Sequence, residues 1–145
     1  MILFAVLVAL GAGGTPAIAS DAELGLRVYA EGRNARGETI RALVGQPPAP
    51  LVGERAACAA CHGADARGGP MPGTSASDIR WSDLARSEGH ARPNGRAYGP
   101  YDVRSFAQAV NEGVDPSGGR LGAAMPRYSL SATEIAALIA FLRTL

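Results

Sequence analysis

The sequence predicts a single, mainly helical domain with three amphipathic helices. Ser20 and Ser131 each open a capping box, and Asp102 can cap a third helix between them. After each of these residues, apolar side chains recur at the three- and four-residue spacing that lines one face of a helix. Residues 20–145 have the length of one ordinary domain.

Residues 1–19 have the composition of an export signal. An apolar run is followed by a helix-breaking Gly/Pro stretch and then by a small-x-small box that ends at Ala19. No Lys or Arg precedes the run, and an uncleaved anchor is the alternative, although the run is short for crossing a bilayer. We therefore expect a signal peptide over 1–19 and a soluble periplasmic domain over 20–145, with no stable membrane insertion after cleavage.

The first helix is expected over about residues 21–32. The Ser20 hydroxyl can cap the backbone while Glu23 reaches back to it. Gly25 inside the helix costs up to ~1 kcal/mol relative to Ala. Close approach of another helix would explain this glycine, with Tyr29 packing one turn further along. The alternative is an ordinary core face that tolerates a glycine.

The helical periodicity fails between residues 33 and 57. Residues 39–44 have the character of a short strand. The Pro-rich segment 46–50 can continue neither a helix nor a central strand. We expect a β-like arm followed by an extended loop over this part of the chain.

Residues 58–62 form the motif Cys-Ala-Ala-Cys-His, which holds both cysteines of the chain and one of its two histidines. Two thiols three positions apart on one helical turn can each form a thioether with a vinyl group of one haem. His62 then lies where a ring nitrogen can bind the iron. The motif therefore predicts one covalent haem c attached through Cys58 and Cys61, a reaction of exported proteins that agrees with the signal segment.

Other uses of the two cysteines explain the motif less well. A thioredoxin-like redox pair would follow a strand of a βαβ unit, and no such pattern precedes Cys58. A structural zinc site needs four ligands, and only Cys58, Cys61, His62 and His90 are candidates. A disulfide between the cysteines would leave His62 unexplained.

The Gly/Pro/Ser-rich segment 68–77 is expected to be a loop. Such a loop is usually a connector, but around a haem it would shield the group from water. Trp81, the only Trp, needs an acceptor for its indole N–H if it is buried. A haem propionate and a plain core position are the two interpretations of Trp81, and Tyr98 and Tyr101 allow the same two.

The second helix is expected from Asp102, with Gly113 just past its end, and a turn over 115–119 follows. Met125 then stands on a Gly-rich loop, directly before Pro126. Methionine is most often a core filler, but this one does not stand on a helix face. The last helix places four aliphatic side chains on one face: Ile135, Leu138, Ile139 and Leu142.

Together these features resemble the class I mono-haem cytochromes c. The matching parts are the first helix with Gly25 and Tyr29, the Cys-Ala-Ala-Cys-His motif, the loop with Met125, and the last amphipathic helix. The resemblance implies an all-α fold in which the first and last helices cross beside the haem, here with a short β-like insertion before the motif. It also implies His62 and Met125 as the axial ligands and one-electron transfer as the function.

The resemblance raises two further points about the ligands. A proline carbonyl downstream of the haem-binding His62 usually accepts the proton of its other ring nitrogen, and Pro70 and Pro72 are both candidates. Met71 is the other methionine of residues 20–145, but it stands only nine positions past His62. So short a segment gives an awkward path from one side of a flat haem to the other, which favours Met125.

These observations lead to the hypothesis of a periplasmic one-electron carrier without catalytic residues, whose partners are a donor dehydrogenase and an acceptor oxidase or cytochrome. The alternatives are a haem subunit of a larger dehydrogenase, a haem enzyme with an open distal site, and a haem-based gas sensor. An enzyme needs acid–base groups beside a vacant iron position, and His90 is expected on a surface loop. The 14 Lys+Arg nearly balance the 13 Asp+Glu without a basic run, so no nucleic-acid partner is expected.

Overall fold

The computed structural model describes residues 19–91 and 97–145. The predicted signal peptide lies outside this part of the chain except for its last residue, Ala19. Within the described ranges, no helix combines the length and the apolar character that crossing a bilayer requires.

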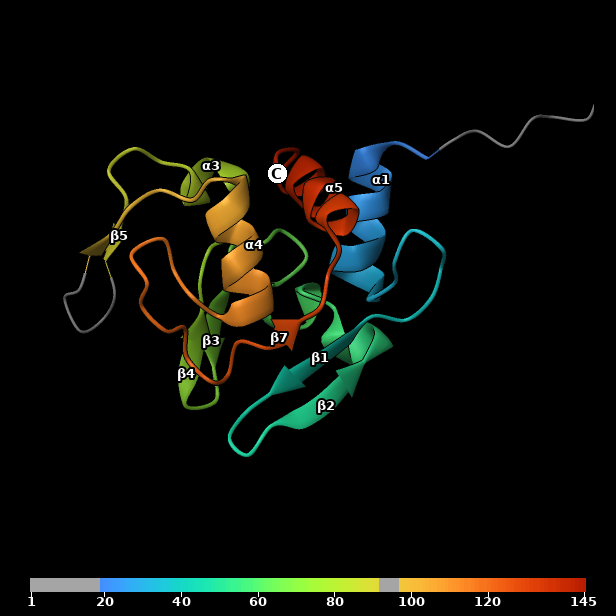
Figure 1. Ribbon diagram of the computed structural model, residues 1–145, viewed down its shortest axis with the longest axis horizontal. Helices are drawn as coiled ribbons and strands as arrows, with labels where there is room; N and C mark the ends of the chain where they lie inside the picture. Colours follow the sequence, from blue (N-terminus) through green and yellow to red (C-terminus); the bar gives the residue numbers. More distant parts are fainter. Residues whose placement is uncertain (1–18, 92–96) are drawn as a thin grey trace, which may run out of the picture.

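The helical elements, in chain order, are α1 (Asp21–Leu26), its π-helical continuation η1 (Arg27–Glu31), the 3-10 helix η2 (Gly53–Ala56), α2 (Ala59–His62), α3 (Trp81–Leu84), α4 (Val103–Glu112) and α5 (Ala132–Leu142). The strands are β1 (Arg41–Val44), β2 (Ala49–Val52), β3 (Gly69–Met71), β4 (Thr74–Ala76), β5 (His90–Ala91), β6 (Ala97–Tyr98) and β7 (Arg127–Tyr128). Figure 1 shows α1 and α5 side by side, α4 next to α5, and the β1–β2 hairpin projecting below them.

The prediction of an all-α fold is wrong. The domain is 36% helical with 20% strand. Within the described residues, the strands form a three-stranded sheet in the order β2-β1-β7 and the antiparallel pairs β3–β4 and β5–β6. The reason lies in the segments between the helices. Their glycines and prolines exclude long helices, so their backbone N–H and C=O groups pair with one another in short ladders.

The predicted β-like arm is a β-hairpin that is built into the domain. β1 pairs with β2 on one edge and with β7 on the other, where Ala42 lies opposite Tyr128. Pro50 is tolerated in β2 because that strand is at the edge of the sheet. Beyond β1, the Gly45 N–H donates to the Ala123 carbonyl at 3.0 Å. The arm therefore supports the loop that precedes β7.

The crossing of the first and last helices is confirmed. The helix expected over 21–32 forms as α1 and η1 and ends at Gly32, which has the left-handed conformation. A Cβ atom on Gly25 would lie only 2.0 Å from the Ala137 carbonyl oxygen of α5, so the two backbones touch at this glycine. One turn further along, the rings of Tyr29 and Phe141 pack with their centroids 5.1 Å apart.

Helix α4 begins and ends as expected. The Asp102 carboxylate accepts a 2.7 Å hydrogen bond from the Ser105 N–H, and Gly113 closes the helix in the left-handed conformation. The buried residues Phe106 and Val110 of α4 belong to the core cluster that includes α5. Both residues also line the cavity described next.

Candidate functional site

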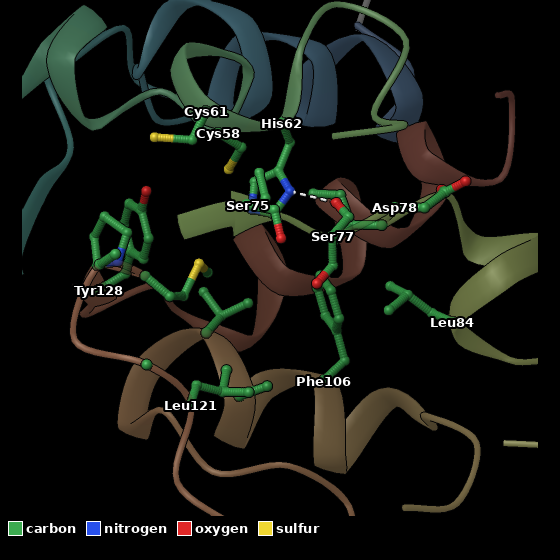
Figure 2. A pocket seen from close by; sticks show the side chains of 18 of the residues that line it. Cys58, Cys61, His62, Ser75, Ser77, Asp78, Leu84, Phe106, Leu121 and Tyr128 are labelled. Atoms are coloured by element: carbon green, nitrogen blue, oxygen red, sulfur yellow. Dashed lines mark hydrogen bonds between the residues drawn. The ribbon is translucent and has the colours of Figure 1, made fainter. Parts of the chain in front are cut away.

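An open cavity lies among the turn at residues 58–62, the β3–β4 hairpin, α4 and the loop 121–126. The space open to the centres of water molecules is about 210 Å³, and most of the lining side chains are apolar or aromatic. Figure 2 shows the two cysteines and His62 on one side and Phe106 and Leu121 on the other. The predicted site residues that line this cavity are Cys58, Cys61, His62, Tyr98 and Met125.

The Cys-Ala-Ala-Cys-His segment forms a single helical turn. Cys58 is the first residue of this turn, and its carbonyl accepts from the His62 N–H at 2.9 Å. Both thiols are free, and both side chains line the cavity. Burial raises the pKa of Cys58 to about 12, whereas a redox-active Cys-x-x-Cys pair has a lowered thiol pKa. The turn therefore presents two free thiols and one imidazole to the same space.

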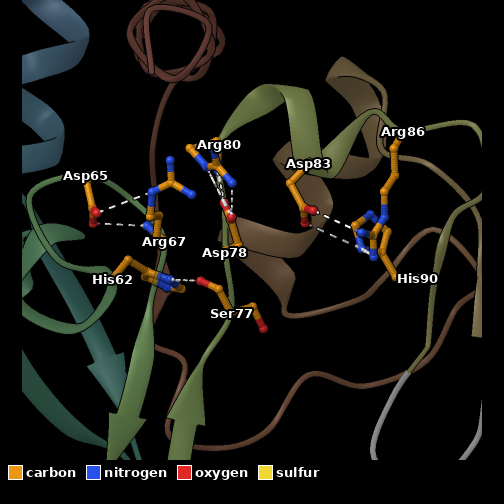
Figure 3. Close-up of polar contacts among 9 residues, drawn as sticks. All are labelled: His62, Asp65, Arg67, Ser77, Asp78, Arg80, Asp83, Arg86 and His90. Atoms are coloured by element: carbon orange, nitrogen blue, oxygen red, sulfur yellow. Dashed lines mark hydrogen bonds and ion pairs between the residues drawn. The ribbon is translucent and has the colours of Figure 1, made fainter.

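His62 is held by a backbone carbonyl. Its Nδ1 donates to the Ser77 carbonyl oxygen at 2.8 Å (Figure 3). Because the proton is on Nδ1, Nε2 carries a free lone pair. The residue is only 7% exposed, and burial lowers the pKa of the imidazole and favours the neutral ring. A neutral imidazole with one fixed N–H is the form that binds a metal ion.

The expectation of Pro70 or Pro72 as the partner of this imidazole is wrong. The β3–β4 hairpin reverses the chain after His62 and returns it at Ser77, directly behind the ring. At the base of the hairpin, Gly68 approaches so closely that a Cβ atom there would lie 2.5 Å from the Ser77 carbonyl oxygen. The carbonyl that faces Nδ1 therefore comes from the return of the hairpin and not from its prolines.

Asp78 follows Ser77 directly and is paired with Arg80. Its carboxylate accepts from the Arg80 guanidinium, Nη2 at 2.5 Å and Nε at 3.0 Å (Figure 3), and from the Arg80 backbone N–H at 3.0 Å. These bonds hold the pKa of Asp78 below its usual value. Asp78 also lines the cavity, whereas Arg80 is not among the described residues that line it.

Both methionines of the described chain, Met71 and Met125, line the cavity. Met71 is in β3, on the hairpin that returns behind His62. Met125 is on the loop between α4 and β7 and packs against the core. The structure thus brings together a thioether and an imidazole from segments that are 63 positions apart in the sequence.

The aromatic candidates separate into two groups. Tyr98 and Tyr101 line the cavity. Trp81 is not among the described residues that line it, and its ring instead packs edge-on against Phe106 at 5.8 Å. The Arg143 guanidinium lies over the Trp81 ring, with Cζ 5.3 Å from the ring centroid.

The placement of His90 on a surface loop is wrong. Its side chain is only 7% exposed and stacks on Tyr98, with the ring centroids 5.0 Å apart. Nε2 lies 3.2 Å from the Leu84 carbonyl oxygen, and Nδ1 lies 3.2 Å from Nη2 of Arg86. Figure 3 shows the His90 ring together with Arg86 and Asp83. His90 is not one of the described residues that line the cavity, so the four candidate zinc ligands do not converge there.

Two features of this site could not be found from motifs. The Ser77 carbonyl belongs to a backbone, and any residue type can supply it. Arg127 donates from Nη2 to the carbonyls of Leu121 and Gly122 at 2.9 and 3.3 Å and also bonds the Met125 carbonyl, so it touches the loop from behind. An arginine directly after Met-Pro was the only available signal for it.

Comparison with known families gives one finding. The family model for cytochrome c matches residues 52–145, which include the whole cavity-lining set. No curated protein matches the chain, and no solved structure does. The match covers more than half of the chain and includes the Cys-Ala-Ala-Cys-His turn and the Met125 loop. The chain belongs to the cytochrome c family.

Proposed function

We propose that residues 20–145 are a periplasmic one-electron carrier with one haem c, attached through Cys58 and Cys61 and ligated by His62 and Met125. The observation that carries this proposal is the meeting of these four side chains at one mainly apolar cavity. Family membership supports haem-based electron transfer. The periplasmic address is supported by the sequence of residues 1–19.

The donor set fits a haem. Cys58 and Cys61 present their thiols on one turn, three positions apart as in the haem c attachment motif. The Ser77 carbonyl keeps the proton of His62 on Nδ1, so that Nε2 is available for the iron. When bound, the haem supplies reversible one-electron chemistry between Fe(II) and Fe(III), and a thioether ligand such as that of Met125 favours the reduced form.

The surroundings of the cavity support a carrier over a haem enzyme. Peroxidase-like chemistry needs an acid–base group beside a vacant iron position. Among the described residues, His90 does not line the cavity, and the carboxylate of Asp78 is paired with Arg80. Met125 can close the remaining position. The redox partners we expect are a donor dehydrogenase and an acceptor oxidase or cytochrome.

The attachment is tested by mass spectrometry of protein made in a host that matures c-type cytochromes. We expect the mass of the chain from Ser20 plus one haem, because both thiols of the turn are free to react. The Cys58→Ser and Cys61→Ser variants should each keep at most one thioether link. Haem that extracts completely from the unaltered protein into acidic organic solvent would contradict the proposal.

Trp81 is proposed as a donor to a haem propionate, as an alternative to a purely structural role beside Phe106 and Arg143. Trp81→Phe keeps an aromatic ring but removes the N–H, so a propionate donor predicts a shift of the reduction potential and of its pH dependence. The loss of the bond costs about 1–3 kcal/mol if the acceptor stays buried. A variant with lower stability but an unchanged potential at every pH would leave Trp81 with the structural role alone.

A further inference from the structure

We propose that Arg127 is a positioning residue for Met125: its guanidinium holds the loop 121–126 from behind and so keeps the thioether in the cavity. This inference rests on the proposed ligation by Met125. It adds a contact that the cysteine–histidine motif does not contain, and it involves Arg127 together with Gly113, the glycine that ends α4.

The first observation is the set of hydrogen bonds made by the guanidinium. Nη2 donates to the carbonyls of Leu121 and Gly122 at 2.9 and 3.3 Å. Nη1 donates to the Met125 carbonyl and, at 3.4 Å, to that of Pro126. One planar group therefore joins the two ends of the loop. Within the described residues these partners are all carbonyl oxygens, which matches the several divergent N–H donors of an arginine fork.

The second observation is the space in which the guanidinium lies. Gly113 ends α4 in the left-handed conformation, and a Cβ atom on it would lie 1.8 Å from Nε of Arg127 and 2.1 Å from Cζ. The arginine therefore packs directly against the bare backbone of Gly113. The Gly113 carbonyl also accepts from the Leu121 N–H at 2.8 Å, at the start of the loop. The end of α4, the Arg127 guanidinium and the start of the loop therefore all contact one another.

The third observation concerns the other contacts of the loop. The Met125 N–H donates to the Gly122 carbonyl at 3.1 Å, a turn within the loop itself. The Ala123 carbonyl accepts from the Gly45 N–H of the β-hairpin. Gly122 has open space at its Cβ position, so side-chain packing does not fix the chain there. The carbonyl contacts of Arg127 add a side-chain link between the two ends of the loop to these backbone hydrogen bonds.

Substitution of Arg127 separates this role from a simple effect of its charge. Arg127→Lys keeps the positive charge but replaces the planar fork by a compact ammonium group, whereas Arg127→Gln removes both. If Arg127 positions the loop, both variants should weaken the sulfur-to-iron charge-transfer band of the oxidised protein. In both, hydrogen exchange of segment 121–126 should be roughly 10- to 100-fold faster, the range expected for losing hydrogen bonds to a charged donor. Exchange of α5 should stay unchanged.

A pair of glycines provides a control that leaves Arg127 itself in place. Gly113 and Gly118 both have left-handed φ angles, 71° and 76°, but a Cβ atom on Gly118 meets nothing within 4 Å. The two alanine variants therefore carry similar backbone strain, and only Gly113→Ala displaces the guanidinium. We expect Gly113→Ala to reproduce the spectrum and exchange of Arg127→Gln, and Gly118→Ala to retain those of the unaltered protein.

The outcomes separate this proposal from the ligand assignment. If the unaltered protein shows the band and Arg127→Lys retains both the band and slow exchange, the positioning role is overturned, and Met125 can still be the ligand. If the unaltered protein lacks the band, ligation by Met125 fails and the positioning role fails with it. Loss of the band in both Arg127 variants, with unchanged exchange in α5, supports the proposal.

Discussion

Met125→Ala is expected to abolish the sulfur-to-iron charge-transfer band of the oxidised protein and to open the iron to carbon monoxide. Alanine cannot bind the metal, so one axial position loses its ligand. The reduction potential should fall by on the order of 0.2 V, a part of the roughly 0.8 V over which axial ligands tune haem, because the thioether that favours Fe(II) is lost. Visible absorption with and without carbon monoxide, together with a redox titration, measures all three effects.

Met71→Ala is the matched control for this experiment. Met71 also lines the cavity, so its loss changes the apolar wall by a similar volume. It belongs to β3, in the hairpin that returns at Ser77, whose carbonyl accepts from Nδ1 of His62. A side chain on this hairpin is badly placed to reach the side of a flat haem opposite His62. The band, the potential and the response to carbon monoxide should therefore stay close to those of the unaltered protein. If Met71→Ala loses the band and Met125→Ala keeps it, the two assignments are reversed.

The residues that sequence reasoning brought to the site share a property: their chemistry depends on the side chain. The thiols of Cys58 and Cys61, the imidazole of His62 and the thioether of Met125 can be recognised in one dimension because few other residues can replace them. The structure brings all four to one cavity. The pairing of the outer helices was predictable for a similar reason, since Gly25 inside a helix needs a close neighbour to explain it.

The features that sequence reasoning missed depend on the backbone or on tertiary packing. The Ser77 carbonyl meets His62 because a hairpin brings the chain back, and no residue type marks that return. His90 follows Ser87-Glu88-Gly89 in the sequence, but in the fold Tyr98 stacks on it and the Leu84 carbonyl oxygen accepts a hydrogen bond from it. The all-α prediction failed because short ladders between irregular segments leave little periodicity to detect.

The second large effect is expected at the crossing of α1 and α5, where Gly25→Ala should strongly destabilise the fold. In an open helix this change is stabilising by roughly 0.5–1 kcal/mol, because alanine is the better helix former. Here the new Cβ atom would lie 2.0 Å from the Ala137 carbonyl oxygen and 2.7 Å from the Phe141 Cβ. One of these neighbours belongs to a helix backbone, which cannot move alone, so the helices must separate. We expect a loss of about 3 kcal/mol in the free energy of unfolding, the upper range for overpacking.

Denaturant unfolding of the haem-loaded protein measures this change, with an unchanged m-value showing that only stability was altered. Gly99→Ala is the control, because a Cβ atom there meets nothing within 4 Å, and its effect should stay within about 0.5 kcal/mol. The crossing also bears on the site, since the Tyr29 hydroxyl of η1 donates to the Gly63 carbonyl at 2.6 Å, next to His62. Separation of the helices should therefore move the reduction potential as well. A Gly25→Ala protein that is as stable as the unaltered one would show that α1 and α5 do not touch at this residue.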